Sequence, residues 1–382
     1  MTVNTPAYCS REDAQQSADF ADGITTAIQV KTDRAIQDAS RNIEGELHRL
    51  FYPQDAVKFF DWPNYQRASP WRLWLNNHDL LCLTAFSSGG VSIPLNACFL
   101  RPANPRPGYP YTSIELDRSS GSTFGGNSAT PQNAISGTGT WGFTADADPA
   151  GTLGAAVTSA SQTTITVSDA SQTGVGDLLV IGYGRGTPAF PSDTLGHAGA
   201  IAPFTGERVL VSDRSASDLS LAQSGSGCST ALDNDNVLAW TGSGSAPPKQ
   251  GEVLLLGQEQ MLVLSVLGST AVVKRSFNGT QLQVHSGDEI FAYRNLTVLR
   301  GFLGTTATTW TNGTAVWKHR YPSLIRDLAI AESANRLLQE TSGYARIVGA
   351  ADMAVPAPGA ALADLWDEAR TAYGRIARIR VI

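Results

Sequence analysis

Two heptapeptides, Gly176-Asp177-Leu178-Leu179-Val180-Ile181-Gly182 and Gly251-Glu252-Val253-Leu254-Leu255-Leu256-Gly257, set the architecture of the middle of the chain. Each is an apolar run of strand length that lies between two glycines. Each is followed by a run that starts on a glutamate, Glu207-Arg208-Val209-Leu210-Val211 and Glu259-Gln260-Met261-Leu262-Val263. Such an internal repeat predicts two related β units that need each other to bury a face.

A second pair of similar segments follows the first. Arg275-Ser276-Phe277-Asn278-Gly279-Thr280 and Arg300-Gly301-Phe302-Leu303-Gly304-Thr305 each lead into an apolar run. Thr241–Gln250 has the Gly, Ser and Pro composition of a linker between the two units. We therefore expect residues 147–320 to form one or two small β-barrels or β-sandwiches.

Both ends of the chain have helical periodicity instead. In residues 10–52, one apolar stripe recurs in steps of three and four, and Thr25 or Thr26 is a plausible helix cap. Tyr52-Pro53 is expected to end this helix. After residue 321, two further stripes at helical spacing predict two C-terminal helices, separated by a mostly apolar loop.

Residues 53–146 form a third region, in which dense aromatic residues and short apolar runs predict strands. Ser88-Gly89-Gly90 has the composition of a hairpin turn. The expected fold class is α+β, with a helical bundle body interrupted by a small β excursion and a large duplicated β insertion. The expected divisions are 1–52 and 321–382 for the body, 53–146 for the excursion and 147–320 for the insertion.

Composition and charge narrow the functional classes. The 382 residues include 37 glycines and only 16 % charged side chains, which suits β structure with many tight turns. The net charge of −6 argues against a protein that grips nucleic acid, although it permits a surface that DNA slides past. We expect no signal peptide and no membrane span, because no long apolar run occurs.

The sequence offers little support for catalysis. The five histidines lack metal-type spacing, and the four cysteines, predicted to be free thiols, form no C-x-x-C motif. No nucleophile motif occurs, so we expect no enzyme activity, no cofactor and no metal site. A pair of carboxylates that hydrolyses glycosides is left open, because the separation of such a pair is not visible in sequence.

Two charged features are candidate docking surfaces. The chain ends in an arginine-rich tail with no acidic residue after Glu368, and arginine suits the recognition of an acidic partner; an alternative is a solvated helix end. The tail candidates are Arg370, Arg375, Arg378, Arg380 and Ile382. The polar face of the first long helix could contact solvent, a neighbouring subunit or a channel, through Lys31, Asp33, Arg34, Asp38, Arg41 and Glu44.

The order of several segments resembles the head–tail connector (adaptor) proteins of long-tailed bacteriophages. These segments are Arg49-Leu50-Phe51-Tyr52-Pro53, Leu73–Leu81, Thr138-Gly139-Thr140-Trp141-Gly142-Phe143 and Tyr321–Ala329. The resemblance covers residues 10–145 and 321–382. Typical members pass almost directly from the Trp-Gly motif to the returning helix, so residues 147–320 are an addition.

The resemblance implies a structural virion protein of the phage neck, assembled in the host cytoplasm. Members of this family form a ring, commonly of twelve subunits, that binds the portal protein and extends the DNA channel through which the genome leaves. Other neck or tail-completion proteins bind below, and no membrane is involved. The resemblance also makes Arg370–Ile382 the candidate for portal docking. The rival interpretations are a tail or baseplate attachment protein that binds a partner or glycan, and a carbohydrate-active enzyme.

Overall fold

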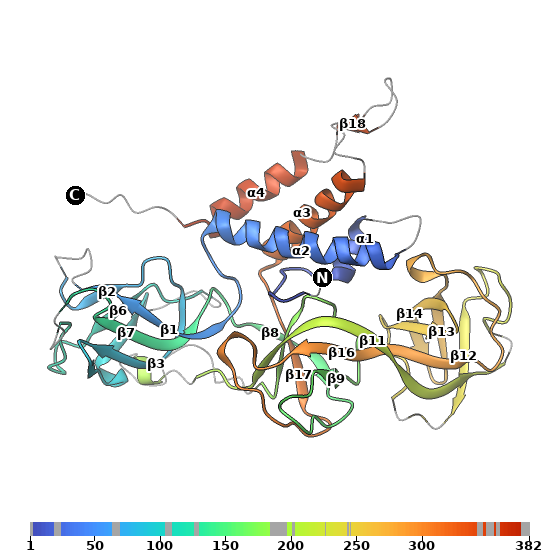
Figure 1. Ribbon diagram of the computed structural model, residues 1–382, viewed down its shortest axis with the longest axis horizontal. Coiled ribbons are helices and arrows are strands. Elements are labelled where there is room, and N and C mark those ends of the chain that lie inside the picture. Colours follow the sequence, from blue (N-terminus) through green and yellow to red (C-terminus); the bar gives the residue numbers. More distant parts are fainter. Residues whose placement is uncertain are drawn as a thin grey trace.

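The computed structural model shows a mostly β chain with a small helical layer. It describes residues 3–18, 24–62, 69–103, 109–125, 130–183, 197–200, 203–225, 227–242, 244, 246–341, 347–348, 355–356 and 360–375. Three β lobes follow one another along the long axis, and the helices lie over the middle one (Figure 1).

The first lobe is built by residues 54–141 from two antiparallel sheets. Their strand orders are β1-β7-β3-β4 and β2-β6-β5. The predicted hairpin turn is confirmed, since Ser88 pairs with Val91 and both Gly89 and Gly90 have positive φ. The strands are β1 (Gln54–Phe60), β2 (Arg72–Trp74), β3 (Leu80–Ser88), β4 (Val91–Ser92), β5 (Cys98–Arg101), β6 (Ser113–Leu116) and β7 (Ile135–Trp141).

The other two lobes share one sheet of ten strands, in the order β8-β17-β10-β11-β12-β15-β14-β13-β16-β9. The long strands β11 and β16 pair with each other as well and run through both lobes (Figure 1). The strands are β8 (Ala147–Thr152), β9 (Thr164–Thr166), β10 (Leu178–Ile181), β11 (Glu207–Gln223), β12 (Val237–Gly242), β13 (Val253–Leu256), β14 (Glu259–Leu267), β15 (Thr270–Lys274), β16 (Glu289–Leu299) and β17 (Ala315–His319).

These two lobes correspond to the repeated units of the sequence. We call the middle lobe the proximal module (147–183, 207–214 and 294–319) and the outer lobe the distal module (215–225, 227–242 and 246–293). Each module contains a one-turn 3₁₀ helix after its repeated arginine, η4 (Phe302–Gly304) in the proximal module and η3 (Phe277–Gly279) in the distal one.

Four α-helices occur among the described residues. They are α1 (Arg11–Ala18), α2 (Thr26–Leu47), α3 (Ser323–Thr341) and α4 (Ala360–Tyr373). The predicted cap at Thr25 is confirmed, because its hydroxyl accepts a hydrogen bond from the Ile28 N–H. Helix α2 ends earlier than Tyr52-Pro53, at Leu47, where His48 adopts the left-handed conformation. Two short helices, η1 (Leu95–Ala97) and η2 (Ala198–Ala200), and the strand pair β18 (Ile347–Val348) and β19 (Val355–Pro356) complete the described elements.

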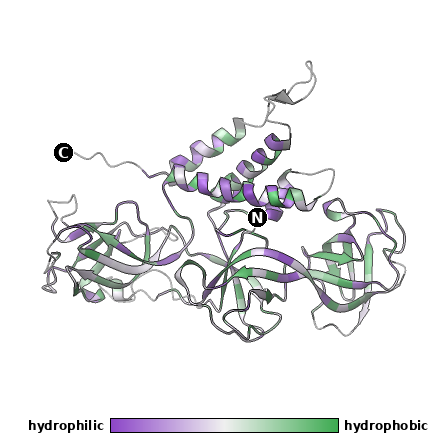
Figure 2. Ribbon diagram, in the orientation of Figure 1, coloured by the Kyte–Doolittle hydropathy of each residue, from purple (hydrophilic) through white to green (hydrophobic). Residues whose placement is uncertain are grey.

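The predicted helical bundle body is wrong, because the chain is mostly β and the helices share their main core with a β-sheet. The described helix residues that cluster by themselves are few: Ala18, Ala35, Ala334 and Leu337. Ile36 and Ile43 of α2 and Ile325 of α3 are fully buried in the same hydrophobic cluster as Leu179 and Val209 of the proximal module. Figure 2 shows hydrophilic residues along much of α2 and α3, whereas the strands carry much of the hydrophobic colouring. An apolar stripe predicts that a helix has a partner without identifying it; here the partner is mainly a β-sheet.

The first lobe and the distal module each have a hydrophobic core without helix α1–α4. The distal core contains Leu238, Leu254, Met261 and Ile290, all fully buried. The first-lobe core contains Leu73, Leu80 and Ile114. Only the proximal module therefore depends on the α-helices for its core.

Candidate functional site

An aromatic junction connects five segments that are far apart in the sequence. Tyr8 lies edge-on to Phe51 at 5.6 Å between ring centroids and to Tyr321 at 5.0 Å. Phe51 and Phe143 are tilted against each other at 5.4 Å between ring centroids. Both lie edge-on to Tyr373, Phe51 at 5.7 Å and Phe143 at 5.4 Å. We call these five residues the aromatic junction. They join the N-terminal segment, the chain just after α2, the loop after β7, the chain just before α3 and the last residue of α4.

Buried polar contacts reinforce the junction. The Tyr8 hydroxyl donates a hydrogen bond to Glu44 Oε1 at 2.7 Å and accepts one from the Phe51 N–H at 3.2 Å. Burial raises the pKa of Tyr8 well above its ordinary value, and the nearby Glu44 carboxylate acts in the same direction. His319 Nε2 lies 2.9 Å from the Phe51 carbonyl oxygen, and burial lowers the pKa of His319 to about 4. The junction is therefore a buried structural element.

Arg375, a predicted docking residue, is bonded within its own chain. Its side chain donates to the carbonyl oxygens of His48 at 2.8 Å and Asn76 at 3.0 Å, and Nη2 lies 2.8 Å from Asp79 Oδ2. Arg49 binds the same carboxylate at 3.2 Å. Burial raises the pKa of Asp79, and the two arginines oppose that shift. The end of α4 is thus fastened to the first lobe.

The rest of the tail divides into one described residue and three that are not described. Arg370 reaches Glu46 at 3.3 Å and Asp367 at 3.2 Å, and its guanidinium lies over the Trp366 ring at 5.4 Å. Arg378, Arg380 and Ile382 lie outside the described residues. A portal contact through Arg370 or Arg375 would have to replace these intramolecular contacts.

Three residues of the predicted α2 face point into the molecule. Asp33 is bound by both Nε and Nη2 of Arg11, at 2.6 and 2.8 Å, and its side chain is 2 % exposed. Arg41 binds Glu44 at 2.8 Å and donates to the Pro6 carbonyl oxygen at 2.7 Å. These residues hold the N-terminal segment against α2, so they do not form an open contact face.

The other three candidates of this face are exposed. Lys31 lies 3.2 Å from Glu340 of α3, and Asp38 lies 3.9 Å from Arg336 of α3. Arg34 is exposed between them along the helix. Surface pairs of this kind contribute at most about 1 kcal/mol each, so a partner could displace them at little cost.

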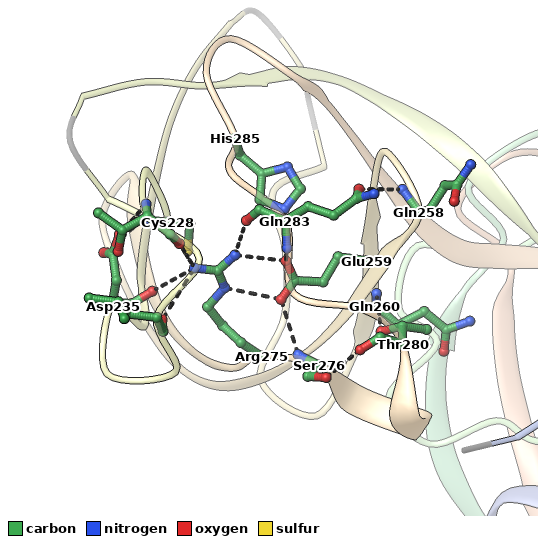
Figure 3. A network of polar contacts seen from close by, with 12 residues as sticks. Cys228, Asp235, Gln258, Glu259, Gln260, Arg275, Ser276, Thr280, Gln283 and His285 are labelled. Carbon is green, nitrogen blue, oxygen red and sulfur yellow. Dashed lines mark hydrogen bonds and ion pairs between the residues drawn. The ribbon is translucent and has the colours of Figure 1, made fainter. Parts of the chain in front are cut away.

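The repeated segments form a matched pair of buried polar clusters, which sequence reasoning did not identify. In the distal module, Arg275 binds Glu259 through Nε at 3.0 Å and Nη2 at 2.7 Å, and neither side chain is exposed (Figure 3). The backbone N–H groups of Ser276 and Gln283 donate to the same carboxylate at 3.0 and 2.9 Å. His285 Nε2 lies 3.0 Å from Glu259 Oε2.

The proximal module repeats this cluster, with the same spacing from the arginine to the later members, although the glutamate lies 93 residues before the arginine there and 16 in the distal module. Arg300 binds Glu207 at 2.5 and 2.7 Å, and the N–H groups of Gly301 and Thr308 donate to that carboxylate at 3.0 and 3.3 Å. Trp310 Nε1 donates to it at 2.8 Å, in the position that His285 occupies in the distal module. We call each cluster a glutamate–arginine staple, because it closes the loop between two strands.

The staples explain the repeated sequence. Burial alone would raise the pKa of Glu207 and of Glu259, but the hydrogen bonds from arginine and backbone N–H groups outweigh it and hold both pKa values below the ordinary range. The acid that follows the first glycine of each heptapeptide is also ion-paired, Asp177 with Lys318 at 2.7 Å and Glu252 with Arg294 at 2.7 Å, although the two cations lie at different positions of their strands. The glutamates and arginines were visible in the sequence, but their pairing depends on how the strands register.

The buried acidic side chains of the described residues are all ion-paired with an arginine or lysine. They are Asp33, Asp79, Glu115, Asp177, Glu207, Glu252, Glu259 and Glu332. A carboxylate held in this way stabilises a loop and is poorly placed to exchange a proton with a substrate. The arrangement therefore supports structural roles for these residues.

Other chemistry has limited material in the described part of the chain. The four cysteines are free, as predicted, and buried, and burial raises the pKa of Cys9 and of Cys98 to about 12. No cluster of three or more histidine, cysteine, aspartate or glutamate side chains there could hold a metal ion. None of the described helices is both long and apolar enough to span a membrane.

Comparison of the chain with protein-family models, curated proteins and solved structures finds no match.

Proposed function

We propose that the chain is a structural protein of a bacteriophage neck. In this role several copies form a ring, commonly of twelve in the resembling family, beneath the portal protein, and the ring extends the DNA channel toward the tail. The function is assembly: the chain binds the portal on one side and a neck or tail-completion protein on the other. The protein would reside at the head–tail junction of the virion.

The aromatic junction is the observation that carries the proposal. The segments that resemble connector proteins are far apart in the chain: Phe51 in the first and Tyr321 in the last are 270 residues apart. Phe51 belongs to the first of these segments, Phe143 to the Trp-Gly motif and Tyr321 to the returning helix. Their contacts through Tyr8 and Phe51 make these segments one spatial unit, so the inserted modules do not separate the segments that carry the resemblance.

Charge and exposure support the same function. A net charge of −6 limits tight binding of DNA, so the chain suits a conduit better than a clamp. Lys31, Arg34 and Asp38 stay exposed on α2 and are available for contact between subunits. Contacts that repeat around a closed ring are heterologous, so they use different surfaces on the two sides of each copy.

Electron microscopy of the purified chain, alone and with its portal protein, tests the proposal. We expect closed rings of defined rotational symmetry that share the axis of the portal. A chain with Lys31→Ala and Arg34→Ala serves as a matched variant, because both side chains are exposed and their loss should leave the fold intact. Monomers or trimers without affinity for the portal would contradict the proposal and favour a tail-borne attachment protein, for which glycan binding would then be measured.

A further inference from the structure

The two modules differ at one place beside their matched staples. In the proximal module, the Trp310 ring covers Gly182 so closely that a Cβ atom at Gly182 would overlap it. The corresponding residues of the distal module are Gly257 and His285. The His285 ring is turned toward carboxylates, with Nε2 3.0 Å from Glu259 and Nδ1 2.7 Å from Asp288. In the distal module the Gln283 side chain lies over the equivalent glycine instead, because a Cβ atom at Gly257 would meet Gln283 Oε1 at 2.9 Å.

A shallow pocket of about 450 Å³ that opens to the surface borders Gly257. Its lining residues are Ala216, Leu255, Gly257, Asp288, Glu289 and Phe291. Leu255 and Phe291 are direct partners across β13 and β16 and form an apolar wall. Asp288 and Glu289 bring two carboxylates to the rim, and the Asp288 side chain remains 43 % exposed. The pocket thus combines an aromatic ring with negative charge.

The two carboxylates belong to the distal module alone. Leu255 pairs with Phe291 and its counterpart Val180 pairs with Trp317, so an aromatic ring occurs at this place in both modules. By the same register, Asp288 and Glu289 correspond to Thr314 and Ala315. The staple forms in the proximal module without either acid, and among the ion pairs of the described residues none involves Glu289. The fold itself therefore does not require these two carboxylates.

The chemistry of the pocket favours a cationic group, and most of all a guanidinium. A cation over a phenylalanine ring gains electrostatic energy, and a planar guanidinium can also bind carboxylates through paired hydrogen bonds. The chain itself supplies such groups. Its last seven residues, Ile376 to Ile382, contain Arg378 and Arg380 and no acidic residue.

We propose that the acidic pocket of the distal module binds an arginine of the C-terminal segment 376–382 of a second copy of this chain. A second copy is required because Arg375, the residue directly before this segment, is bonded to the first lobe. That lobe and the strands β13 and β14 lie at opposite ends of the molecule (Figure 1). The contact is heterologous, so it can repeat from copy to copy around a ring. It concerns contact between copies and does not depend on the portal.

A peptide titration tests this inference on the full-length chain. The probe is a labelled peptide of residues 374–382, and the control peptide carries glutamine in place of Arg378 and Arg380. Binding is followed by fluorescence anisotropy at low salt and again at high salt, which weakens contacts between charges. We expect the first peptide to bind and the control peptide to bind at least about tenfold more weakly.

Variants of the chain locate the binding site. Glu289→Gln removes an exposed pocket carboxylate without a buried contact, and we expect it to weaken binding of the first peptide about tenfold. Asp233→Asn, an exposed acidic residue of the same module outside the pocket, provides the matched control and should leave binding unchanged. Circular dichroism verifies that both variants are folded.

The outcomes separate this inference from the proposed function. No binding at about 1 mM peptide, or equal binding to the Glu289→Gln variant and the unaltered chain, would overturn it. If the peptide instead binds isolated portal protein and not this chain, the tail contacts the portal; the inference then fails while the neck function stands. If the peptide binds the pocket but the chain forms no rings, this inference stands and the proposed neck function fails.

Discussion

The proximal and distal modules contain the same glutamate–arginine staple but stand in different surroundings. The proximal staple, Glu207 with Arg300, lies in the module whose core includes α2 and α3, whereas the distal staple, Glu259 with Arg275, lies beside a core of strands alone. The comparison teaches that two modules can share the same local interaction and still differ in whether each can fold without the rest of the chain. Independence depends on which apolar surfaces the module shares.

Excision of each region tests this difference most severely. In one variant, residues 219–290 are replaced by Asn-Gly, which joins the paired residues Asp218 and Phe291, and Arg294→Met is added because its partner Glu252 is removed. In the other variant, residues 150–318 are replaced by a Gly/Ser linker. We expect the first to fold. In the second we expect the helices to unfold, because they lose the strands under α2, whereas the first lobe keeps its own core.

Solubility and far-ultraviolet circular dichroism measure the outcome of both excisions. A soluble, helical product from the second variant would show that the helices can form a core without the β modules, and the comparison would then be invalid. Failure of the first variant to fold would show that the distal module contributes more to the rest of the molecule than its separate core indicates.

Single substitutions in the staples give a smaller effect with a clearer location. Glu207→Gln and Glu259→Gln each leave a buried arginine without its charged partner, which costs about 3–5 kcal/mol. Hydrogen exchange measured by mass spectrometry should show faster exchange in the helices and the proximal module for Glu207→Gln, and in the distal module alone for Glu259→Gln. Glu289→Gln, an exposed position, is the control. Identical exchange patterns in the two staple variants would contradict the comparison.

Acidification should act on the shared core through His319. Its pKa is lowered from 6.5 to about 4, mainly by burial, so the folded state resists protonation. The unfolded state takes up the proton first, and stability that is present above pH 6.5 is lost as the pH falls toward 4. The loss should reach ~3 kcal/mol, because one pKa unit corresponds to about 1.4 kcal/mol.

Denaturation curves of the unaltered chain and of His319→Gln between pH 7 and pH 4 measure this effect. The variant should lose the part of the pH dependence that His319 causes, since glutamine does not titrate in this range. Exchange in the distal module should respond less than exchange in α2 and α3. An unchanged pH dependence in the variant would assign the acid sensitivity to other groups.

Substitution of the two corresponding glycines gives the smallest expected difference. Gly182 and Gly257 both have positive φ, +67° and +56°, so alanine costs about 1–2 kcal/mol of backbone strain at either position. At Gly182 the added methyl also overlaps the Trp310 ring, which adds roughly 1–3 kcal/mol. At Gly257 it meets only Gln283 Oε1, the end of a flexible side chain that can shift at smaller cost. Thermal unfolding should therefore show a greater loss for Gly182→Ala. Equal losses would indicate that the Trp310 side chain moves aside freely.

Part of this structure was predictable from local patterns. The repeat, the hairpin turn at Gly89-Gly90 and the cap at Thr25 follow from glycine, from turn chemistry and from side-chain capping, and the structure contains all three. The stretch Val91–Phe99 shows the limit of this approach. Strands were expected in residues 53–146 as a whole, but in this stretch the chain forms β4, then η1, then β5. Local propensity does not record where a neighbouring strand ends.

The candidate docking residues show the same limit. Arg375, Asp33 and Glu44 read as exposed charges, because a charged side chain carries no sign of its partner in the sequence. Asp79, Arg11 and Tyr8 bind them from 22 to 296 residues away, distances in the chain that no local pattern spans. The distal pocket was missed for the same reason, since Phe291 and Asp288 come together with Leu255 only across paired strands.

The sequence by itself determined the duplicated β units, the helical periodicity of both ends and the absence of familiar catalytic motifs, because these properties depend on residues close together in the chain. Only the tertiary structure decided that α2 and α3 share their core with the proximal module, that the repeated acids and arginines form staples, and that Trp310 covers Gly182 where Gln283 covers Gly257. Those outcomes depend on burial of apolar surface and on strand register between distant segments, which are properties of the folded chain.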